Sequence, residues 1–547
     1  MASSNQTRTA NDFLQSIGVN THLSWQDLAG YANPSVVEKS IAYLGATHVR
    51  DGIPYTGWTL PEYVAIAQAG LKFDIIASGP AIDIAKDVAQ AVLLDQAVPG
   101  SVAAMEGANE FNTQNSTFNG ASSAGNPAWA QQYGPALYSA VKSNPTLSGA
   151  AVIAASMANA GAPEIQKEGN VSSFVDSSNW HTYFGNGNQP AGNLATAISN
   201  AKATAPGKPF SITETGYYTA VDATDWDGGG VSPAVQAVLT VNTLLDAFND
   251  GVATTYLYEL MNNVASPAST DLEGNFGLFL ADGTPKPAAT AIHNLTTLLA
   301  DPGSKASTFQ AGTLPANITG LPSTVSSMTL EKSDGTYDLV VWNEPKVWDE
   351  ASRSAVSPSA TAVSVDLGAT YHTVRLYDPL AGMAAFQTLT DVGKVSLSLA
   401  ADPVIIEIDP AKPTASSTAT AAIPAAAAAP AAAGAGTTAA VSTLTLHLSE
   451  DAWQGNAQFL VSVDGKALNA ATEVTALHKD GTVQEFAFAG SFGAGPHDVA
   501  VSFLNDAYGG SAATDRNLYV NAIDLDSQHK NVGAVLYGNG TQHFSIG

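Results

Sequence analysis

Eight β-rich runs alternate with helix-like stretches through the first 300 residues, and this alternation constrains the fold more than any other feature. Their starts lie 27 to 48 residues apart, close to the roughly 30 residues that one strand-helix unit of a (β/α)8 barrel takes. A last helix-like stretch, ADGTPKPAATAIHNLTTLLAD, follows the eighth run and would close the ring. We therefore expect an α/β chain whose residues 1–303 form a TIM barrel. The eight runs begin at Ser16, Ala46, Phe73, Val102, Ala150, Asn179, Pro209 and Ala253.

Beyond the barrel the texture of the sequence changes. Residues 304–410 contain alternating segments such as YDLVVWNEP, TAVSVDLG, HTVRLYDP and PVIIEIDP, separated by turn residues, which predicts a β-sandwich. Residues 411–440 are rich in Ala, Pro and Thr and poor in large apolar side chains, which is typical of a linker. Residues 441–547 return to strand patterns and predict a second β-sandwich, in the form of an accessory binding module.

Charge and composition narrow the possible partners. The formal net charge is -27, so the protein would repel nucleic acids and anionic membranes, and we expect neither as a partner. There are no cysteines, which excludes disulfides, thiolate metal sites and cysteine nucleophiles. No apolar run is long enough to span a membrane, and no glycine-rich loop has the spacing of a nucleotide-binding motif.

Two glutamates stand where a barrel places its catalytic side chains, at the carboxyl ends of strands. Glu110 ends the fourth run in GANEFN, and Glu214 ends the seventh in ITETGYY. Glycoside hydrolysis needs two carboxyl groups facing each other: one protonates the leaving oxygen, and the other either attacks the sugar or activates water. A glutamate elsewhere in an α/β chain is usually a solvated surface residue, but both of these close β-runs.

These motifs resemble the large clan of retaining barrel glycosidases, which carry an Asn-Glu pair after strand four and a Glu after strand seven. The resemblance covers roughly residues 10–300 and is nearest to glycoside hydrolase family thirty-nine, a β-xylosidase-like family. It implies that Glu110 is the acid/base, that Glu214 is the nucleophile, and that Asn109 holds the sugar 2-hydroxyl.

The resemblance also implies roles for neighbouring residues. Arg50, in HVRDG, would keep the nucleophile ionised, although it could instead form a purely structural ion pair with Asp51. His181 and Tyr183, in NWHTYFG, would contact the nucleophile and the sugar; for His181 the alternative is an ordinary histidine at the barrel rim.

Three further residues are candidates for binding the sugar. Trp25 follows the first run, and Tyr258 and Glu259 end the eighth in YLYELMNN. Aromatic faces stack on pyranose rings, so Trp25 and Tyr258 are possible sugar platforms, but tryptophans also commonly serve hydrophobic cores.

The C-terminal segments SEDAWQGNAQFLVSVDGK and VSFLNDAYGGSAATDRNLYVNAIDL resemble small calcium-dependent xylan-binding modules. In these a protein-held Ca²⁺ itself coordinates sugar hydroxyls, because the ion takes six to eight oxygen ligands. The alternative is that these acidic and amide residues only make turns between strands. The candidate ligands are Asp506, Asp515, Glu450 and Asp451, with Asn517 and Gln454 as neighbours.

Together these features predict a retaining hydrolase of a polysaccharide or oligosaccharide, with xylan favoured, that needs no cofactor for catalysis. A hydrolase of bacterial exopolysaccharide, a transglycosylase and a non-catalytic polysaccharide-binding protein remain alternatives. The initial MASSNQTRTANDF has no signal-peptide pattern, which fits either a cytoplasmic protein or one whose export signal has been removed. We infer secretion, or export to the periplasm, from the expected substrate alone. The sequence leaves the oligomeric state, the linkage, and endo or exo action open.

Overall fold

The computed structural model describes residues 7–223, 229–319, 321–409, 442–463, 466–468, 472–490, 492, 497–507, 514–525, 528–536, 538 and 540–546. Contacts divide the chain into two compact units, the first comprising nearly all residues up to 414 and the second nearly all those after it. The linker predicted at 411–440 lies outside the described residues. Among the helices that are described, none is long and apolar enough to cross a membrane.

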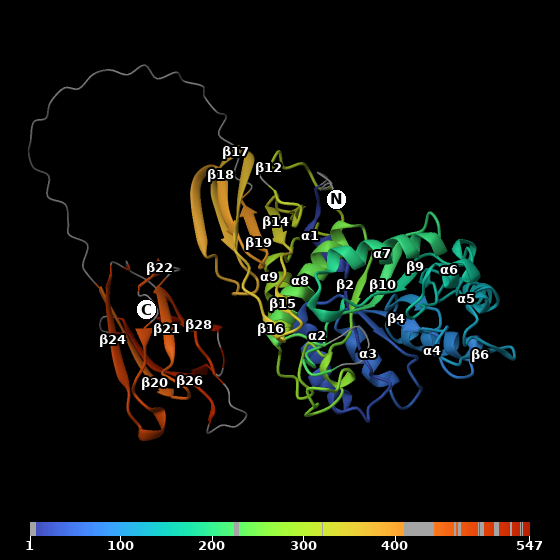
Figure 1. Ribbon diagram of the computed structural model, residues 1–547, viewed down its shortest axis with the longest axis horizontal. Helices are drawn as coiled ribbons and strands as arrows, with labels where there is room; N and C mark the ends of the chain where they lie inside the picture. The colour runs from blue at the N-terminus through green and yellow to red at the C-terminus, as the bar shows by residue number, and fades with distance from the viewer. Residues whose placement is uncertain are drawn as a thin grey trace, which may run out of the picture. The chain divides into compact units, whose positions relative to one another are not determined.

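The first unit contains the predicted TIM barrel (Figure 1). Eight parallel strands follow one another in the order β8-β5-β4-β3-β2-β11-β10-β9, and a parallel bridge between Ile153 and Ser177 joins the two ends. All eight predicted runs supply one strand each. Their bounds are β2 (Ile17–Asn20), β3 (His48–Asp51), β4 (Lys72–Ile76), β5 (Val102–Glu106), β8 (Ala151–Ile153), β9 (Ser178–His181), β10 (Phe210–Thr215) and β11 (Thr255–Leu257).

Helices surround this sheet, and several begin with proline at their first position, where the missing N–H has no helical partner to lose. The helix predicted to close the ring is α9. The helices are α1 (Ala10–Gln15), α2 (Pro34–Leu44), α3 (Leu60–Gln68), α4 (Ile84–Ala97), α5 (Ala130–Ser143), α6 (Ala162–Glu168), α7 (Pro190–Thr204), α8 (Pro233–Asn249) and α9 (Pro287–Leu298). Short 3-10 turns are Ala29–Tyr31, Pro127–Trp129, Ser172–Phe174, Gly185–Gly187 and Glu273–Asn275, and β6 (Thr117–Phe118) pairs with β7 (Ala121–Ser122).

Strand β10 differs from an ordinary buried strand in its polarity. All six of its residues are buried, although its sequence FSITET is mostly polar. Buried polar side chains need hydrogen-bond partners, so this composition indicates a polar network inside the mouth of the barrel.

A second β-layer packs against the barrel within the same unit. One face of β14 joins the barrel core through Val340 and Trp342, while Leu339 and Val341 on its other face join a separate core. The sheet runs β1-β13-β14-β19-β17-β12, with β18 paired to β17, and β15 pairs with β16 apart from it. The strands are β1 (Arg8–Thr9), β12 (Asn317–Thr319), β13 (Val325–Glu331), β14 (Tyr337–Asn343), β15 (Trp348–Asp349), β16 (Ser354–Ala355), β17 (Thr361–Tyr377), β18 (Gln387–Leu399) and β19 (Val404–Ile408).

Strand β17 differs from the sequence prediction, which separated TAVSVDLG from HTVRLYDP by a turn. The structure makes them one strand, with a shift of register against β18 between Asp366 and Tyr371. Gly368 has φ +74° in this irregularity, a conformation that costs glycine little. Because β18 pairs with both halves, the chain bends without leaving the sheet.

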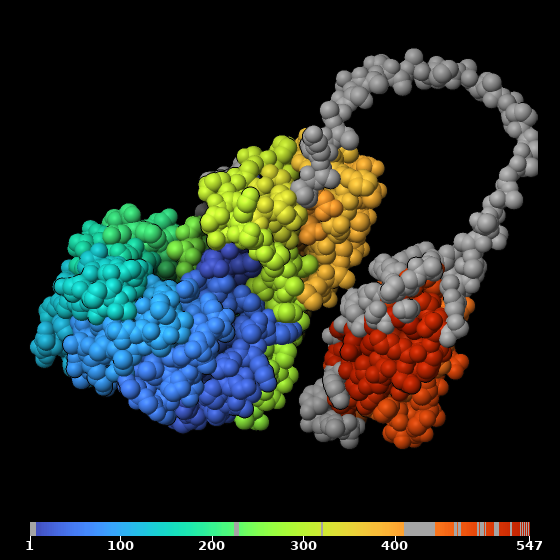
Figure 2. All heavy atoms as spheres, turned by 180° about the vertical axis from the view of Figure 1, so that it is seen from behind, coloured from blue at the N-terminus to red at the C-terminus, as the bar shows by residue number. Residues whose placement is uncertain are grey.

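The N-terminus also belongs to this sheet. β1 pairs in parallel with β13, with Arg8 opposite Leu330. Figure 2 shows the dark blue start of the chain against the yellow-green residues of the sheet. The segment that leads into the barrel is therefore a strand of the neighbouring sheet, so barrel and sheet are joined by β1 as well as by a common core.

The second unit is a sandwich of two antiparallel sheets, ordered β24-β20-β26-β27 and β22-β21-β25-β28, with β23 paired to β21. Alternating residues of both sheets, such as Leu446 and Val501, form its core. Its strands are β20 (Ser442–Asp451), β21 (Gln458–Val463), β22 (Lys466–Ala467), β23 (Thr472–Glu473), β24 (Gln484–Gly490), β25 (His497–Phe503), β26 (Asn517–Leu525), β27 (Gln528–Leu536) and β28 (Gly540–Ile546), with a 3-10 turn at His478–Asp480.

Substitution of Trp342 tests the contact between the barrel and the seven-stranded sheet. Trp342 is fully buried, and its indole N–H donates to Asp246 Oδ1 of α8 at 2.8 Å. Replacing it with alanine should lower the free energy of unfolding by about 3–5 kcal/mol, because a large cavity opens and Asp246 loses its donor. Thermal and urea unfolding measure this. Trp342→Phe should cost less, and equal stability of the alanine variant and the parent protein would contradict the packing described.

Candidate active site

Glu110 lies in the loop after β5 and Glu214 lies within β10, so both reach the carboxyl-end mouth of the barrel. Glu110 has φ +40°, an uncommon conformation for a residue with a side chain. Its N–H donates to Ser156 Oγ at 2.9 Å, a contact that anchors it to the segment after β8. Strain held by surrounding contacts is typical of functional positions.

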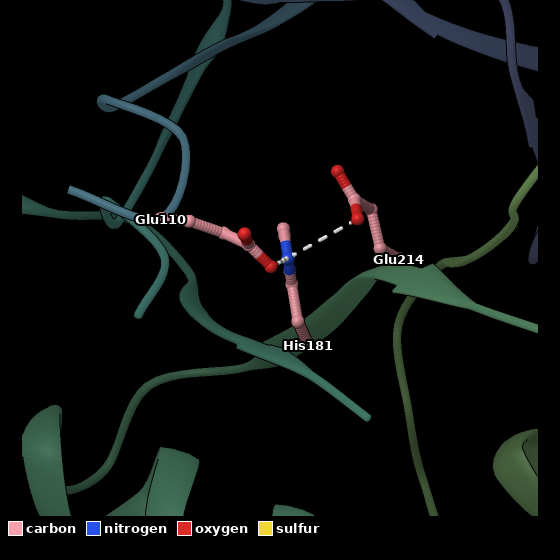
Figure 3. Close-up of side chains that lie close together, drawn as sticks. All are labelled: Glu110, His181 and Glu214. Atoms are coloured by element: carbon pink, nitrogen blue, oxygen red, sulfur yellow. Dashed lines mark hydrogen bonds and ion pairs between the residues drawn. The ribbon is translucent and has the colours of Figure 1, made fainter. Parts of the chain in front are cut away.

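The two glutamates converge on His181 of β9 (Figure 3). His181 Nδ1 lies 3.0 Å from Glu110 Oε1 and 3.4 Å from Glu214 Oε2. One side-chain atom from each of the three residues lies within 4.8 Å of the others, so a Glu110 oxygen and a Glu214 oxygen are no farther apart than that. Both carboxylates can therefore reach one bond of a bound molecule.

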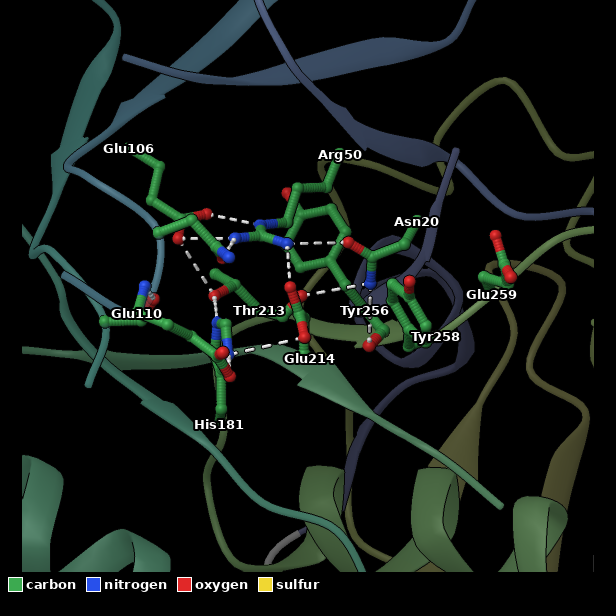
Figure 4. Close-up of polar contacts among 12 residues, drawn as sticks. Asn20, Arg50, Glu106, Glu110, His181, Thr213, Glu214, Tyr256, Tyr258 and Glu259 are labelled. Carbon is green, nitrogen blue, oxygen red and sulfur yellow. Dashed lines mark hydrogen bonds and ion pairs between the residues drawn. The ribbon is translucent and has the colours of Figure 1, made fainter. Parts of the chain in front are cut away.

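Arg50 of β3 holds Glu214 in place with a fully used guanidinium (Figure 4). Nη1 donates to Glu214 Oε1 and to Asn20 Oδ1, each at 2.8 Å. Nη2 donates to Asn109 Oδ1 at 2.7 Å, and Nε and Nη2 donate to Glu106 at 2.6 and 2.8 Å. These five bonds use all five N–H donors, so Arg50 keeps none for an anionic ligand.

The alternative ion pair between Arg50 and Asp51 is wrong for this structure. Asp51 instead accepts hydrogen bonds from the Thr21 hydroxyl at 2.6 Å, the Leu23 N–H at 2.7 Å and the Tyr63 hydroxyl at 2.8 Å. Asp51 therefore fastens the loop after β2 to the end of β3.

Glu214 is buried but stays ionised. Burial pushes its pKa up, but His181 and Arg50 nearby, together with hydrogen bonds from Tyr183 and Arg50, outweigh it and hold the pKa below the usual 4.5. The Tyr183 hydroxyl donates to Glu214 Oε2 at 2.8 Å. A buried, ionised and oriented carboxylate is suited to nucleophilic attack.

A buried network behind the mouth was missed by the sequence prediction. Glu106, at the end of β5, accepts from Arg50, from Asn179 Nδ2 at 3.0 Å and from Thr213 Oγ1 at 3.2 Å. Thr213 Oγ1 also lies 3.1 Å from His181 Nε2, which orients the ring that faces the glutamates. A carboxylate inside the apolar run VAAME was the signal that could have identified Glu106.

The remaining predicted sugar contacts gather around His22, after β2. Glu259 is fully buried, and its Oε2 lies 3.2 Å from His22 Nε2 and accepts from the Tyr31 hydroxyl at 3.0 Å. The Tyr258 hydroxyl lies 3.2 Å from the same nitrogen, and Trp25 stacks on His22 with ring centres 5.5 Å apart. Glu259 thus lies behind His22, whereas Trp25 is exposed, not a core residue.

The pKa of His22 is higher than that of an ordinary histidine. Burial of His22 favours the neutral ring, but the hydrogen bond and charge of Glu259, followed by the charges of Asp51 and Glu214, raise the pKa above 6.5. These contacts favour the protonated form of the ring at the rim of the site.

A polar cleft of about 250 Å³ opens beside Glu110. Apart from Glu110 and His181 its lining carries no ionisable group other than the Tyr183 hydroxyl, and lysine and arginine are absent from it. The other lining residues are Ala158, Asn159, Ala160, Trp180, Thr182, Asn193, Thr196, Ala197 and Asn200.

The trio Glu110, His181 and Glu214 also has the spacing of a metal-binding group. Both Glu214 oxygens, however, already accept hydrogen bonds from Arg50 and Tyr183. A divalent cation there would lie beside the Arg50 guanidinium, and this repulsion disfavours it. The donor set fits proton transfer and nucleophilic attack better than metal binding.

In the second unit the predicted calcium ligands fall into two pairs, Asp506 with Asp515 and Glu450 with Asp451. Burial and then the charge of Asp515 raise the pKa of Asp506, so these two acids lie near each other. Asp451 accepts from the Tyr519 hydroxyl at 2.6 Å. Glu450 Oε2 accepts from the Ala457 N–H, while Glu450 Oε1 and Asn517 Oδ1 are buried oxygens that have no hydrogen-bond partner among the described residues.

Unpartnered buried oxygens are suitable ligands for a hard cation. Within the part of the module that the structure describes, however, no three acidic or histidine side chains converge as closely as Glu110, His181 and Glu214 do. These carboxylate and amide oxygens are of the type that calcium prefers as ligands. Further peptide or amide oxygens would have to complete the coordination of the ion.

The ionised state of Glu214 predicts how stability depends on pH. Because its pKa in the folded protein lies below the usual 4.5, its contribution is present above about pH 4.5 and is lost as the pH falls through the lower folded value. Glu214→Gln should therefore show a shallower loss of melting temperature than the parent between pH 5 and about pH 3. The exposed Glu350→Gln is the control, and identical slopes for Glu214→Gln and the parent would contradict the assignment.

Among the comparisons with known proteins, the match to a protein-family model falls in the second unit. Residues 443–535 match the model of CBM60, described as a Ca-dependent carbohydrate-binding module that binds xylan. A comparison with curated protein sequences found no match.

Likenesses to solved structures are distant. A Rhizomucor miehei β-1,3-glucanosyltransferase mutant in complex with laminaritriose is 15% identical, with 52% of this chain and 97% of that chain covered and a TM-score of 0.35. A glucosidase from Croceicoccus marinus is 13% identical, with 68% and 91% covered and a TM-score of 0.44. A β-D-glucuronidase from Dictyoglomus thermophilum is 15% identical, with 51% and 50% covered and a TM-score of 0.39.

These likenesses are too weak to support an argument about activity, and they do not single out family thirty-nine. The match to residues 443–535 is of a different kind, because it identifies a defined module. The chain is thus a carbohydrate-active protein in which a TIM barrel with a paired-glutamate site precedes a C-terminal segment that matches the CBM60 carbohydrate-binding module.

Proposed function

We propose that the protein is a retaining O-glycoside hydrolase that cleaves a polysaccharide by double displacement. The observation that supports it most is the approach of Glu110 and Glu214 oxygens to within 4.8 Å across His181. Carboxyl groups about 5 to 5.5 Å apart are typical of retention, because a wider gap is needed to admit the water of a single inversion.

In the first step Glu214 attacks the anomeric carbon while Glu110 gives its proton to the leaving oxygen. The carbon-oxygen bond of the glycoside breaks, a glycosyl ester of Glu214 forms, and the leaving sugar departs with the proton. In the second step Glu110, now ionised, takes a proton from water, whose oxygen replaces Glu214 at the same carbon.

The surrounding residues suit these steps. Arg50 and Tyr183 orient Glu214 and keep it ionised before attack. Asn109 uses its carbonyl oxygen to accept from Arg50, so its amide N–H groups rather than its oxygen would meet a sugar hydroxyl. His22 and Trp25 supply a donor and an aromatic face at the rim, and Glu259 holds His22.

The substrate we favour is a xylan-like polysaccharide, because the description of CBM60 names xylan and a binding module concentrates an enzyme on its polymer. Such polymers lie outside cells, so we place the protein in the extracellular space or the periplasm. A bacterial exopolysaccharide as substrate and transfer of the glycosyl group to a sugar acceptor are outcomes that product analysis would reveal.

A non-catalytic polysaccharide-binding protein is the rival from another class. Against it stands the cost of keeping two carboxylates close together, one of them buried beside a fully engaged arginine. A barrel that served only as a scaffold gains nothing from this arrangement.

Glu214→Gln should abolish hydrolysis, because the amide cannot form the glycosyl ester. Glu110→Ala should lower kcat about 10²- to 10⁴-fold on substrates with poor leaving groups and far less on activated aryl glycosides. Added azide should restore turnover of Glu110→Ala and give a glycosyl azide of retained anomeric configuration, read by NMR. Glu350→Gln is the control, and full activity of Glu214→Gln would refute the mechanism.

Calcium should matter for polymer binding and not for bond cleavage. Chelation with EDTA should weaken retardation of the protein in gels that contain soluble xylan, and added Ca²⁺ should restore it. Asp506→Ala and Asp515→Ala should reproduce the loss, whereas the exposed Asp480→Ala should not. Hydrolysis of a small aryl glycoside should persist in EDTA, and undiminished xylan retardation there would exclude a calcium-dependent module.

A further inference from the structure

Two features at the mouth of the barrel extend beyond the bond-cleaving residues. One is the polar cleft beside Glu110, described above. The other is a group of exposed aromatic side chains, here called the aromatic shelf: Trp25 is 58% exposed, Tyr55 43% and Trp58 54%. Large aromatic side chains left in water, close to a binding site, indicate a surface that a partner covers.

The shelf belongs to two loops that are fastened together. Trp25 follows β2, whereas Tyr55 and Trp58 follow β3. Asp51 joins these loops through Thr21, Leu23 and Ser24, and a Cβ placed on Gly52 would lie 3.2 Å from Ser24 Oγ.

Contacts within the second loop also hold its aromatic residues in place. Trp58 N–H donates to Tyr55 O at 3.2 Å, and the two rings lie 6.1 Å apart at an angle of 30°. The shelf is therefore preorganised, which reduces the entropy lost when a ligand binds.

The strand order places the cleft and the shelf opposite each other. The cleft is formed by residues after β5 and β8, by the end of β9 and by α7, whereas the shelf follows β2 and β3. In the ring β8-β5-β4-β3-β2-β11-β10-β9, the β8–β9 edge is diametrically opposite the β2–β3 edge. A line between them passes between β5, which Glu110 follows, and β10, which carries Glu214.

This geometry points to internal cleavage of a neutral polysaccharide chain that crosses the barrel mouth, an inference that rests on the proposed hydrolase function. The part released with the proton from Glu110 lies in the polar cleft, and the part bound to Glu214 extends over the shelf. The site is thus open on both sides of the scissile bond, as endo action requires.

The chemistry of the cleft selects an uncharged chain, whereas on the shelf Lys86 Nζ lies 5.7 Å from the centre of the Tyr55 ring. Amide and hydroxyl groups of Asn159, Asn193, Thr196 and Asn200 suit sugar hydroxyls, and the cleft has no lysine or arginine for a uronate carboxylate. Arg50 has no free N–H for one either. Aromatic faces bind pyranose rings through their apolar faces.

The first test measures the mode of cleavage with the full chain. Soluble β-xylan, mixed-linkage β-glucan and a glucuronate-rich polysaccharide serve as separate probes, and specific viscosity is plotted against new reducing ends. We expect viscosity on a neutral polymer to fall steeply while few ends have appeared. Release of only mono- or disaccharides at nearly constant viscosity, or a preference for the glucuronate-rich polymer, would overturn the inference.

The second test locates the two surfaces with labelled oligosaccharides of two to six sugars from the polymer that is cleaved. Trp58→Ala should lower the ratio of kcat/KM for the hexamer to that for the dimer about tenfold, and Trp58→Phe should restore much of it. Asn193→Ala with Asn200→Ala should move the cleavage position toward the reducing end, because sugars in the cleft lose their contacts.

Leu93→Ala, an exposed apolar change on α4, is the control. Unchanged ratios and unchanged cleavage positions in the shelf and cleft variants would refute the proposed path while leaving the hydrolase assignment intact. Activity that survives in Glu214→Gln would instead refute the hydrolase assignment itself, so the two failures are distinguishable.

Discussion

The site depends on one buried guanidinium. Arg50 connects the strands that carry Asn20, Glu106 and Glu214, and it also reaches Asn109 in the loop before the acid. A buried positive charge is tolerated only when its donors are satisfied and opposite charges lie close. All five N–H groups of Arg50 have acceptors, and Glu106 and Glu214 supply the opposite charges. The arginine therefore sets the relative positions of the residues around it.

The same constraint connects stability with chemistry. Removing Glu106 or Glu214 would leave part of the guanidinium unpaired in a dry environment, which is costly. The arrangement also keeps Glu214 ionised despite its burial. A carboxylate that is both desolvated and ionised is a better nucleophile than one exposed to water, because fewer solvent contacts must be broken before attack.

The outer parts of the molecule serve the same center in different ways. The seven-stranded sheet includes β1 and packs against α8 through Trp342, so it is joined to the barrel on its outer side. Around the mouth, the loops after β2 and β3 carry aromatic faces, whereas the cleft beyond Glu110 is polar. A chain of sugars has both kinds of surface, apolar ring faces and hydroxyl edges, so the two sides complement different parts of one polymer.

The sequence by itself determined the barrel, because eight runs at nearly regular spacing have few other ways to bury their apolar residues. It also predicted that Glu110 and Glu214 would meet, since strand ends in a barrel share one mouth, and it predicted the binding module from that module's own motifs. Only the tertiary structure showed that Glu106 is the main partner of Arg50, that Glu259 lies behind His22, and that β17 continues through Gly368. Those facts depend on which side chains meet across strands far apart in the chain, and on pairing with β18, neither of which local periodicity encodes.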